Sequence, residues 1–120
     1  MANSFRDLTV WQRAVQMTVA IYKITEQFPR AEVFGLTSQL RRSAVSVASN
    51  IAEGYGRATK GEYVHFLGMA RGSNCELQTQ LVIASELQFG DKELWQAAEK
   101  FSHEVGKMIT AIMKSLQSRV

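Results

Sequence analysis

The sequence predicts an all-α protein, an antiparallel up-down-up-down four-helix bundle that forms one domain over residues 1–120. The chain has a single proline in 120 residues and many residues that favour helices, which predicts long, uninterrupted helices. Its composition, 46% hydrophobic and 21% charged, is that of a globular domain rather than a disordered chain. Apolar residues recur at helical spacing along four segments. Because about four such helices use up the whole length, a bundle around one core is expected.

The first helix is predicted over about residues 9–27, and it carries two adjacent apolar rows. One row is Leu8, Trp11, Val15, Tyr22 and Phe28, and the other is Val10, Ala14, Met17, Ile21 and Ile24. A helix on the outside of a bundle needs only one apolar row, so two rows predict wide burial. The helix is expected to stop at Phe28, because the residue before Pro29 avoids the α-helical conformation. Residues 30–35 are predicted to form a loop.

The second helix is predicted over about residues 36–53. Its core face is Leu36, Leu40, Ala44, Val47 and Ile51. A polar row beside it, Arg42, Ser46, Ser49 and Glu53, has small residues in the middle. Small side chains let another backbone come close. In the sequence Gly54-Tyr55-Gly56, Gly54 is predicted to be a left-handed C-terminal cap.

The third helix is predicted over about residues 60–88, after a capping box formed by Thr59 and Glu62. Its core face is Tyr63, Phe66, Leu67, Ala70, Leu77, Leu81 and Ala84. Its far side carries a row of small residues, Gly68, Gly72, Cys75 and Thr79. A glycine inside a helix costs about 1 kcal/mol relative to alanine. Two glycines in one row therefore predict a compensating close contact.

The fourth helix is predicted over about residues 92–117, with Gly90 ending the third helix and Asp91 capping the fourth. Its inward row is Leu94, Ala98, Phe101, Val105, Met108, Ile112 and Leu116, and Lys100, Lys107 and Lys114 line the opposite face. The small-residue rows, or the extra apolar row of the first helix, predict either a subunit interface or tight packing within one bundle.

Two polar residues on these helices are predicted to have structural roles. Asn74 falls in the middle of the third helix's core face, where a buried amide needs hydrogen-bond partners and commonly fixes the register of packing. Asn50 is expected to act similarly on the second helix.

Several features predict where the protein resides and which chemistries it lacks. Cys75 is the single cysteine, which fits a reducing compartment. The N-terminus resembles no signal peptide, and no apolar run approaches the roughly 20 residues that span a bilayer. We therefore expect a cytoplasmic protein that contacts no membrane.

No enzymatic activity, cofactor, metal or small-molecule substrate is expected. The possible metal ligands, His65, His103, Cys75 and Glu76, fall into no C-x-x-C, H-E-x-x-H or E-x-x-H pattern. Glu53 and Glu76 are the best candidates for a catalytic carboxylate pair. Because buried charges persist when paired, each is more readily explained as the partner of an arginine.

The distribution of charge points to an anion-binding face. The net charge is +3, but residues 1–60 carry eight Lys and Arg against four Asp and Glu. The turn Gly-Tyr-Gly-Arg-Ala-Thr-Lys-Gly is not a P-loop, because Lys60 precedes its glycine and a helix precedes the turn. The free amides at the start of the third helix, beside Arg57 and Lys60, could still hold a phosphate.

The candidate residues for nucleic-acid binding are Arg41, Arg42, Arg57, Lys60 and Arg71. Arg41 and Arg42 lie about 100° apart on a helix, which predicts separate tasks for them. Arg41 borders the core and is expected to be a structural ion-pair partner. Arg42, Arg57 and Lys60 are expected to meet an external anion.

Four segments of the sequence carry a further signal. They are Phe5 to Ala14, with its Leu-x-Val-Trp run; residues 28–44, with Gln-Leu-Arg-Arg; Asn-Ile-Ala-Glu-Gly at residues 50–54; and residues 66–77. Together they resemble the four-helix bundle protein family, also called the 23S rRNA intervening-sequence protein family.

The resemblance implies a bacterial protein whose bundles assemble into a ring-like homopentamer. A related branch, the accessory protein of diversity-generating retroelements, binds nucleic acid and a reverse transcriptase, and is markedly more basic. The resemblance brings no catalytic residues. Positions that match its motifs are Arg41, Arg42, Asn50, Glu53, Gly54, Gly72, Ser73 and Glu76, and a structural role is compatible with each.

Two functions follow from these observations. The first is a non-enzymatic oligomeric scaffold that binds RNA, or an RNA-associated protein together with its RNA. The alternative is a protein–protein adaptor without nucleic-acid contact, in which the arginines form internal salt bridges with Glu53 or Glu76.

Overall fold

The computed structural model describes residues 4–118, and these form four long helices and two short 3-10 turns. The elements are η1 (Phe5–Asp7), α1 (Thr9–Thr25), η2 (Arg30–Glu32), α2 (Leu36–Tyr55), α3 (Lys60–Glu86) and α4 (Lys92–Gln117). No strand occurs within this described part. All four predicted helices are present, and their ends differ from the prediction by at most two residues.

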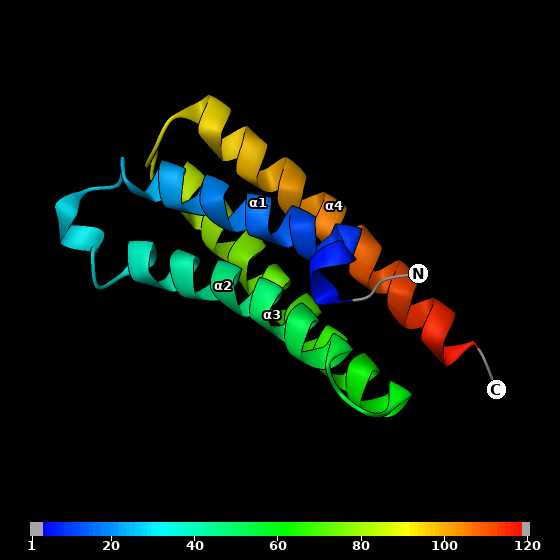
Figure 1. Cartoon of the computed structure of the whole chain (residues 1–120). Helices are drawn as coiled ribbons and strands as arrows, with labels where there is room; N and C mark the ends of the chain where they lie inside the picture. The colour runs from blue at the N-terminus through cyan, green and yellow to red at the C-terminus, as the bar shows by residue number, and fades with distance from the viewer. Residues whose placement is uncertain (1–3, 119–120) are drawn as a thin grey trace.

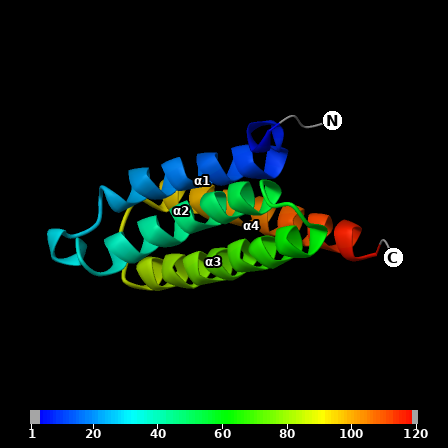
Figure 2. The same cartoon turned by 60° about the horizontal axis from the view of Figure 1, so that its bottom comes forward.

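The helices form an elongated bundle of 48 × 22 × 21 Å in which consecutive helices run in opposite directions (Figure 1). Each helix packs against two neighbours: α1 and α3 both contact α2 and α4, and α2 and α3 make the most extensive contact. Figure 2 shows α2 and α3 side by side, joined by a short turn near the end of the bundle where the chain termini lie. The predicted four-helix arrangement is therefore confirmed.

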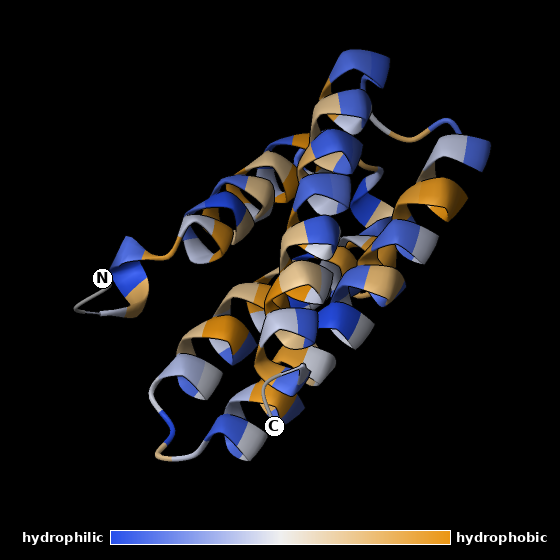
Figure 3. Cartoon of the chain, turned by 90° about the vertical axis from the view of Figure 1, so that its right-hand side faces the viewer, coloured by the Kyte–Doolittle hydropathy of each residue, from blue (hydrophilic) through white to orange (hydrophobic). Residues whose placement is uncertain are grey.

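Hydrophobic and hydrophilic residues alternate around the helices (Figure 3), and the buried ones form one continuous core. On α1 the buried row is Val10, Ala14, Met17, Ile21 and Ile24. The second apolar row of α1 lies at the edge of the core, since Trp11 and Val15 are half-buried and Tyr22 is 41% exposed. Phe28, the last residue of this row, is buried, so the predicted wide burial of the helix is confirmed only in part.

The buried row of α4 differs from the predicted one. It is Ala98, Ser102, Val105, Ile109 and Met113, whereas Leu94, Phe101, Met108, Ile112 and Leu116 lie half-buried beside it. Ala98 and Val105 are buried as predicted, whereas Ser102, Ile109 and Met113 were not in the predicted row, Ser102 because it is polar. The serine is fully buried because its hydroxyl group donates a hydrogen bond to Asn74 of α3.

Asn74 confirms the prediction of a buried, hydrogen-bonded amide in the core face of α3. It is 2% exposed, and its Nδ2 donates to the backbone oxygen of Ser102 at 2.9 Å. Asn50 differs, because its Nδ2 donates only within α2, to the backbone oxygen and the hydroxyl group of Ser46. The expectation that Asn50 fixes packing between helices is not supported by its contacts.

Gly54 has a different role from the predicted left-handed cap. It lies inside α2, which continues to Tyr55, and the positive φ angles in the described chain belong to Gln88 and Gly90. A Cβ atom at Gly54 would lie 2.7 Å from the Cβ of Phe66. Gly54 is therefore needed because α2 and α3 approach closely at this point.

The predicted helix starts are confirmed. Thr59 caps α3, since its Oγ1 accepts from the Glu62 amide at 3.1 Å and donates to the Glu62 carboxylate at 3.1 Å. Asp91 caps α4 by accepting from the amides of Glu93 and Leu94. No helix within residues 4–118 is long and apolar enough to span a membrane.

Candidate nucleic-acid interface

The five cations that the sequence suggested for nucleic-acid binding do not gather at one place. Arg41 and Arg42 lie near the start of α2, Arg57 and Lys60 lie at the α2–α3 turn, and Arg71 lies on α3. Arg42 and Arg57 are 15 residues apart, which is about 22 Å along a helix at 1.5 Å per residue. Each place therefore has to be judged separately.

At the α2–α3 turn the positive charge is balanced by neighbouring carboxylates. Arg57 contacts Glu53 at 2.9 Å and Glu62 at 3.9 Å, and its guanidinium lies 4.7 Å from the centre of the Phe66 ring. Thr59 already accepts from a free amide of α3. Lys60 is exposed. This turn is a weaker anion site than the sequence indicated.

The carboxylates do not form the buried pairs with arginines that we expected. Glu53 pairs with Arg57 on the surface, where the side chain of Glu53 is 53% exposed. Glu76 is exposed and makes no ion pair within residues 4–118. The sequence could not show this, because it depends on which way each helix faces.

The first turn of α3, next to the loop between α2 and α3, carries the one side chain whose pKa shift is clear in the described part of the chain. Partial burial raises the pKa of the Tyr63 phenol above its usual value of 10.0, and the neighbouring Tyr55 adds to the shift. The two rings pack edge to face with their centres 5.9 Å apart.

Arg41 has a structural role, but not as the predicted ion-pair partner. Its Nε donates to Thr25 Oγ1 at 2.8 Å, and its guanidinium lies 4.4 Å from the centre of the Tyr22 ring. One of its terminal nitrogens also lies 3.4 Å from the Tyr22 backbone oxygen. Arg41 therefore ties the start of α2 to the end of α1 through neutral partners.

Arg41 and Arg42 nevertheless share one surface feature, although the sequence placed them on different faces of the helix. Both line a cleft of about 470 Å³ between α1, α2 and the loop that joins them. The cleft is lined by Tyr22, Val33, Thr37, Ser38, Arg41, Arg42 and Val45. The angle of 100° between the two residues considers α2 alone. The loop before α2 forms a second wall, through Val33, and both arginines line the cleft beside it.

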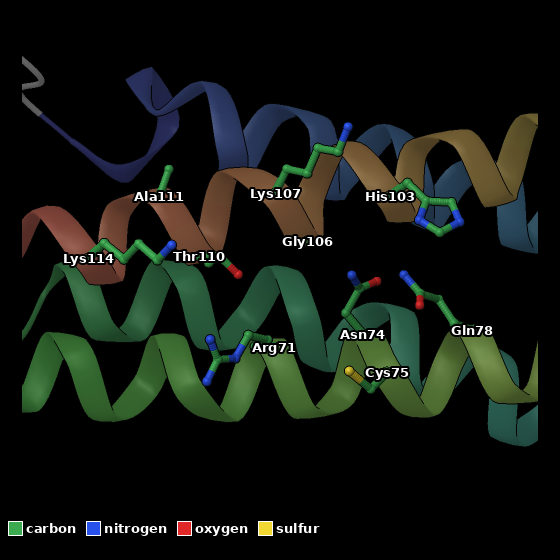
Figure 4. A pocket seen from close by; sticks show the side chains of 10 residues that line it. All are labelled: Arg71, Asn74, Cys75, Gln78, His103, Gly106, Lys107, Thr110, Ala111 and Lys114. Carbon is green, nitrogen blue, oxygen red and sulfur yellow. The ribbon is translucent and has the colours of Figure 1, made fainter.

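A groove with a volume of about 520 Å³ lies between α3 and α4 (Figure 4). Its lining is Arg71, Asn74, Cys75, Gln78, His103, Gly106, Lys107, Thr110, Ala111 and Lys114. Three of these side chains are cations, Arg71 from α3 and Lys107 and Lys114 from α4, and none is a carboxylate. The groove therefore presents uncompensated positive charge from two facing helices.

Hydrogen bonds within the protein fix the amides of this groove. Asn74 and Ser102 are joined by two bonds, and Gln78 Nε2 donates to the Ser102 hydroxyl at 2.9 Å. Gly106 lies against this network, because a Cβ there would be 3.2 Å from Asn74 Nδ2. The amides of the groove are therefore held by the protein itself, and the cations are its charged groups.

Lys107 and Lys114 were not among the sequence candidates, although the signal was present. Their spacing of seven residues had indicated a solvent-facing row on α4 together with Lys100. The small-residue row on α3 also belongs to this groove, since Cys75 lines it together with these lysines. Only the pairing of α3 with α4 connects the two rows.

The close contact expected at the glycines of α3 is absent within the described chain. A Cβ at Gly72 would meet no atom within 4 Å, and one at Gly68 would reach only the Cε of Met113, at 3.8 Å. Among residues 4–118, no three His, Cys, Asp or Glu side chains come together in a way that could hold a metal ion.

Comparisons with known proteins agree with this fold. The family described as 23S rRNA-intervening sequence protein matches residues 6–111. One similar solved structure is a crystal structure of a protein with unknown function from the S23 ribosomal protein family of Bacteroides thetaiotaomicron. It has a TM-score of 0.79 and 21% sequence identity, over 88% of this chain and 99% of that chain. At this identity the likeness shows the fold alone. Comparison with curated proteins found no match.

Proposed function

The chain belongs to the 23S rRNA-intervening sequence protein family, and on this premise we propose that it is a non-enzymatic scaffold that binds RNA along the α3–α4 groove. The observation that carries the proposal is the charge of that groove. Arg71, Lys107 and Lys114 line it from two helices, and no carboxylate lines it.

The physical basis is the release of counterions from a phosphate backbone. Each phosphate that a lysine or arginine neutralises releases a condensed ion, so affinity falls as salt is added. A groove with three cations supplies only a few such contacts, and a single copy is expected to bind weakly. The net charge of +3 is consistent with modest affinity per chain.

Assembly of several copies would strengthen such weak sites. We include in the proposal the homopentamer that the family resemblance implies, because linked sites act at a high effective concentration. Exposed apolar surface supports an interface between copies. Phe34 is 96% exposed, and an apolar groove of about 370 Å³ between α1 and α4 is lined by Val15, Val19, Leu94 and Phe101, among others.

RNA binding can be tested by fluorescence anisotropy with a labelled, structured RNA over a range of salt concentrations. The variant Lys107→Gln/Lys114→Gln removes two charges from the groove. The control Lys92→Gln/Lys100→Gln removes two exposed charges from the same helix outside the groove lining. We expect the groove variant alone to lower the slope of log K against log salt, by about 0.7–0.9 per lost contact.

Two results would contradict this function. One is the absence of binding by the wild-type protein to any structured RNA or DNA at low ionic strength. The other is an equal loss of RNA affinity in the groove variant and its control, which would show that the groove binds no better than the rest of the charged surface. Light scattering should give a mass near five times 13.4 kDa for the assembled protein, and a monomer at micromolar concentration would remove the assembly.

The exposed side chain of Phe34 favours a second candidate, a protein–protein adaptor without RNA contact. Phe34 is 96% exposed and the neighbouring Val33 is 47% exposed, and exposed apolar surface of this kind can bind a partner protein. The adaptor predicts that Phe34→Ser weakens protein assembly while the two lysine pairs have no effect on any nucleic acid. The scaffold predicts that the groove variant lowers RNA affinity in protein that still assembles.

A further inference from the structure

The cleft between α1, α2 and the loop at residues 30–35 is not used by the proposed function. It lies near the start of α2, whereas the RNA groove is formed by α3 and α4 on another face of the bundle. Two guanidinium groups and two hydroxyl groups line it, from Arg41, Arg42, Thr37 and Ser38. This set of donors is suited to a compact anion with several acceptor oxygens.

Arg41 is already held in position for such a ligand. Thr25, which is 3% exposed, accepts from Arg41 Nε, and the Tyr22 ring lies beneath the guanidinium. The Nη1 atom of Arg41 has no partner within residues 4–118. Because the side chain is fixed before a ligand arrives, little rotamer entropy is lost on binding.

The other donors of the cleft are also available. Arg42 is exposed and makes neither an ion pair nor a hydrogen bond with the described residues. The hydroxyl groups of Thr37 and Ser38 line the cleft and have no hydrogen-bond partner among the described residues, so both can donate to a ligand oxygen.

Opposing charge is absent from the lining of the cleft. The nearest carboxylate along the loop belongs to Glu32, and its Oε1 accepts from the Leu36 amide at 3.1 Å. That contact holds Glu32 at the start of α2, and Glu32 does not line the cleft. The two arginines therefore face the cleft without a neutralising partner on its walls.

From these contacts we propose that the cleft binds the phosphate group of a phosphomonoester. Arg42 supplies a bidentate pair of donors, Arg41 its free Nη1, and Thr37 and Ser38 their hydroxyl groups. The apolar parts of Tyr22, Val33 and Val45 form the remaining walls. A cleft of about 470 Å³ has room for the organic group that carries the phosphate.

The test is a titration of ¹⁵N-labelled protein followed through the Nε–H signals of its arginines, with calorimetry for the affinities. The probes are inorganic phosphate, adenosine 5′-monophosphate and adenosine, in buffer of low ionic strength. We expect both phosphates to shift the Arg41 and Arg42 signals and adenosine to leave them unchanged. Tighter binding of the nucleotide identifies a phosphomonoester as the natural ligand, and equal binding identifies free phosphate.

Three variants make the test specific. Arg42→Gln is expected to weaken binding of the nucleotide at least about tenfold, in line with the loss of a bidentate charged contact. Arg42→Lys should recover only part of it, because an ammonium group lacks the planar fork. The control is Arg30→Gln, which removes an exposed charge from the same loop without touching the cleft and should leave affinity within about twofold.

Several outcomes would overturn the proposal. They are unshifted Arg41 and Arg42 signals at millimolar phosphate, equal effects of Arg42→Gln and Arg30→Gln, or an equal response to adenosine. The Lys107→Gln/Lys114→Gln variant should bind the nucleotide like the wild-type protein. Loss of RNA binding and loss of phosphate binding are therefore separate results, and either can fail without the other.

Discussion

Asn74 and Ser102 are joined by two hydrogen bonds across the α3–α4 contact. Asn74 Nδ2 donates to the Ser102 backbone oxygen at 2.9 Å, and the Ser102 hydroxyl donates to Asn74 Oδ1 at 2.8 Å. Both residues are buried, and Asn74 lines the basic groove. These bonds can form only when each helix has a particular rotation about its axis. The pair therefore fixes which faces of α3 and α4 meet, and so the positions of the groove's cations.

Replacing Asn74 with leucine should therefore destabilise the protein despite the apolar surroundings. The Ser102 hydroxyl and backbone oxygen would lose their buried partner, which costs about 1–3 kcal/mol in the free energy of unfolding measured by urea titration. The double variant Asn74→Leu/Ser102→Ala removes the hydroxyl as well and should recover part of this loss. Additive effects of the two single changes would contradict the coupling.

Arg41 should contribute to stability, whereas Arg42 should not. Arg41→Met removes the hydrogen bond to Thr25 and the contact with the Tyr22 ring, and we expect a loss of about 1–2 kcal/mol. Arg42→Met changes an exposed side chain without partners and should stay within about 0.5 kcal/mol. Urea unfolding of both variants gives the comparison, and equal effects would show that Arg41 is not a tie between α1 and α2.

Local sequence patterns were sufficient to predict the helices. They did not predict features that depend on tertiary contacts. Apolar periodicity and capping residues such as Thr59 and Asp91 act within a few residues, so they are visible in the sequence. Ser102 is buried only because Asn74 lies opposite it. Gly54 lies within α2 and against α3. The sequence alone does not distinguish a glycine that caps a helix from one that lets two helices pack closely.

The candidate sites show the same division. The charge pattern of the sequence identified Arg71, Arg41 and Arg42 as candidates. It did not predict which residues surround them. Lys107 lines the same groove as Arg71 because α3 packs against α4. Arg41 and Arg42 line one cleft because the loop at Val33 forms its other wall. Long cationic side chains extend over neighbouring surface, so the residues that they contact depend on the fold as well as on the angle around the helix.

Two glycines on α2 and α3 should respond to alanine in opposite ways. At Gly54 the new Cβ would lie 2.7 Å from the Cβ of Phe66, and both atoms are fixed to backbone, so the helices have to separate. Overpacking of this kind costs about 1–3 kcal/mol. At Gly72 nothing lies within 4 Å, and alanine should stabilise the chain by up to about 1 kcal/mol.

Thermal unfolding at low protein concentration measures both changes on the separate chain. Light scattering at higher concentration then tests Gly72 in the assembly. If Gly72→Ala stabilises the chain but lowers the assembled mass, the glycine lies at the interface between copies. Destabilisation of the separate chain by Gly72→Ala would contradict the open surroundings found there.

Stability at alkaline pH should depend on Tyr63. Burial and the neighbouring Tyr55 raise the pKa of its phenol above 10.0 in the folded protein, while the unfolded chain keeps the usual value. Below about pH 10 the phenol is protonated in both states, and its contribution to stability is fully present. Above that pH the unfolded state releases the proton first, so stability falls as pH rises towards and through the folded-state pKa.

The variant Tyr63→Phe keeps the ring and removes the titrating group. Its free energy of unfolding should therefore fall less steeply than that of the wild-type protein above pH 10, as measured by urea titration at successive pH values. All other residues are the same in both proteins, so the comparison isolates the effect of removing the Tyr63 phenol, including its interaction with Tyr55. Tyr22→Phe, which removes a hydroxyl from a residue that is 41% exposed, is the matched control. A wild-type slope no steeper than that of Tyr63→Phe would show that burial at the α2–α3 turn does not disfavour the phenolate.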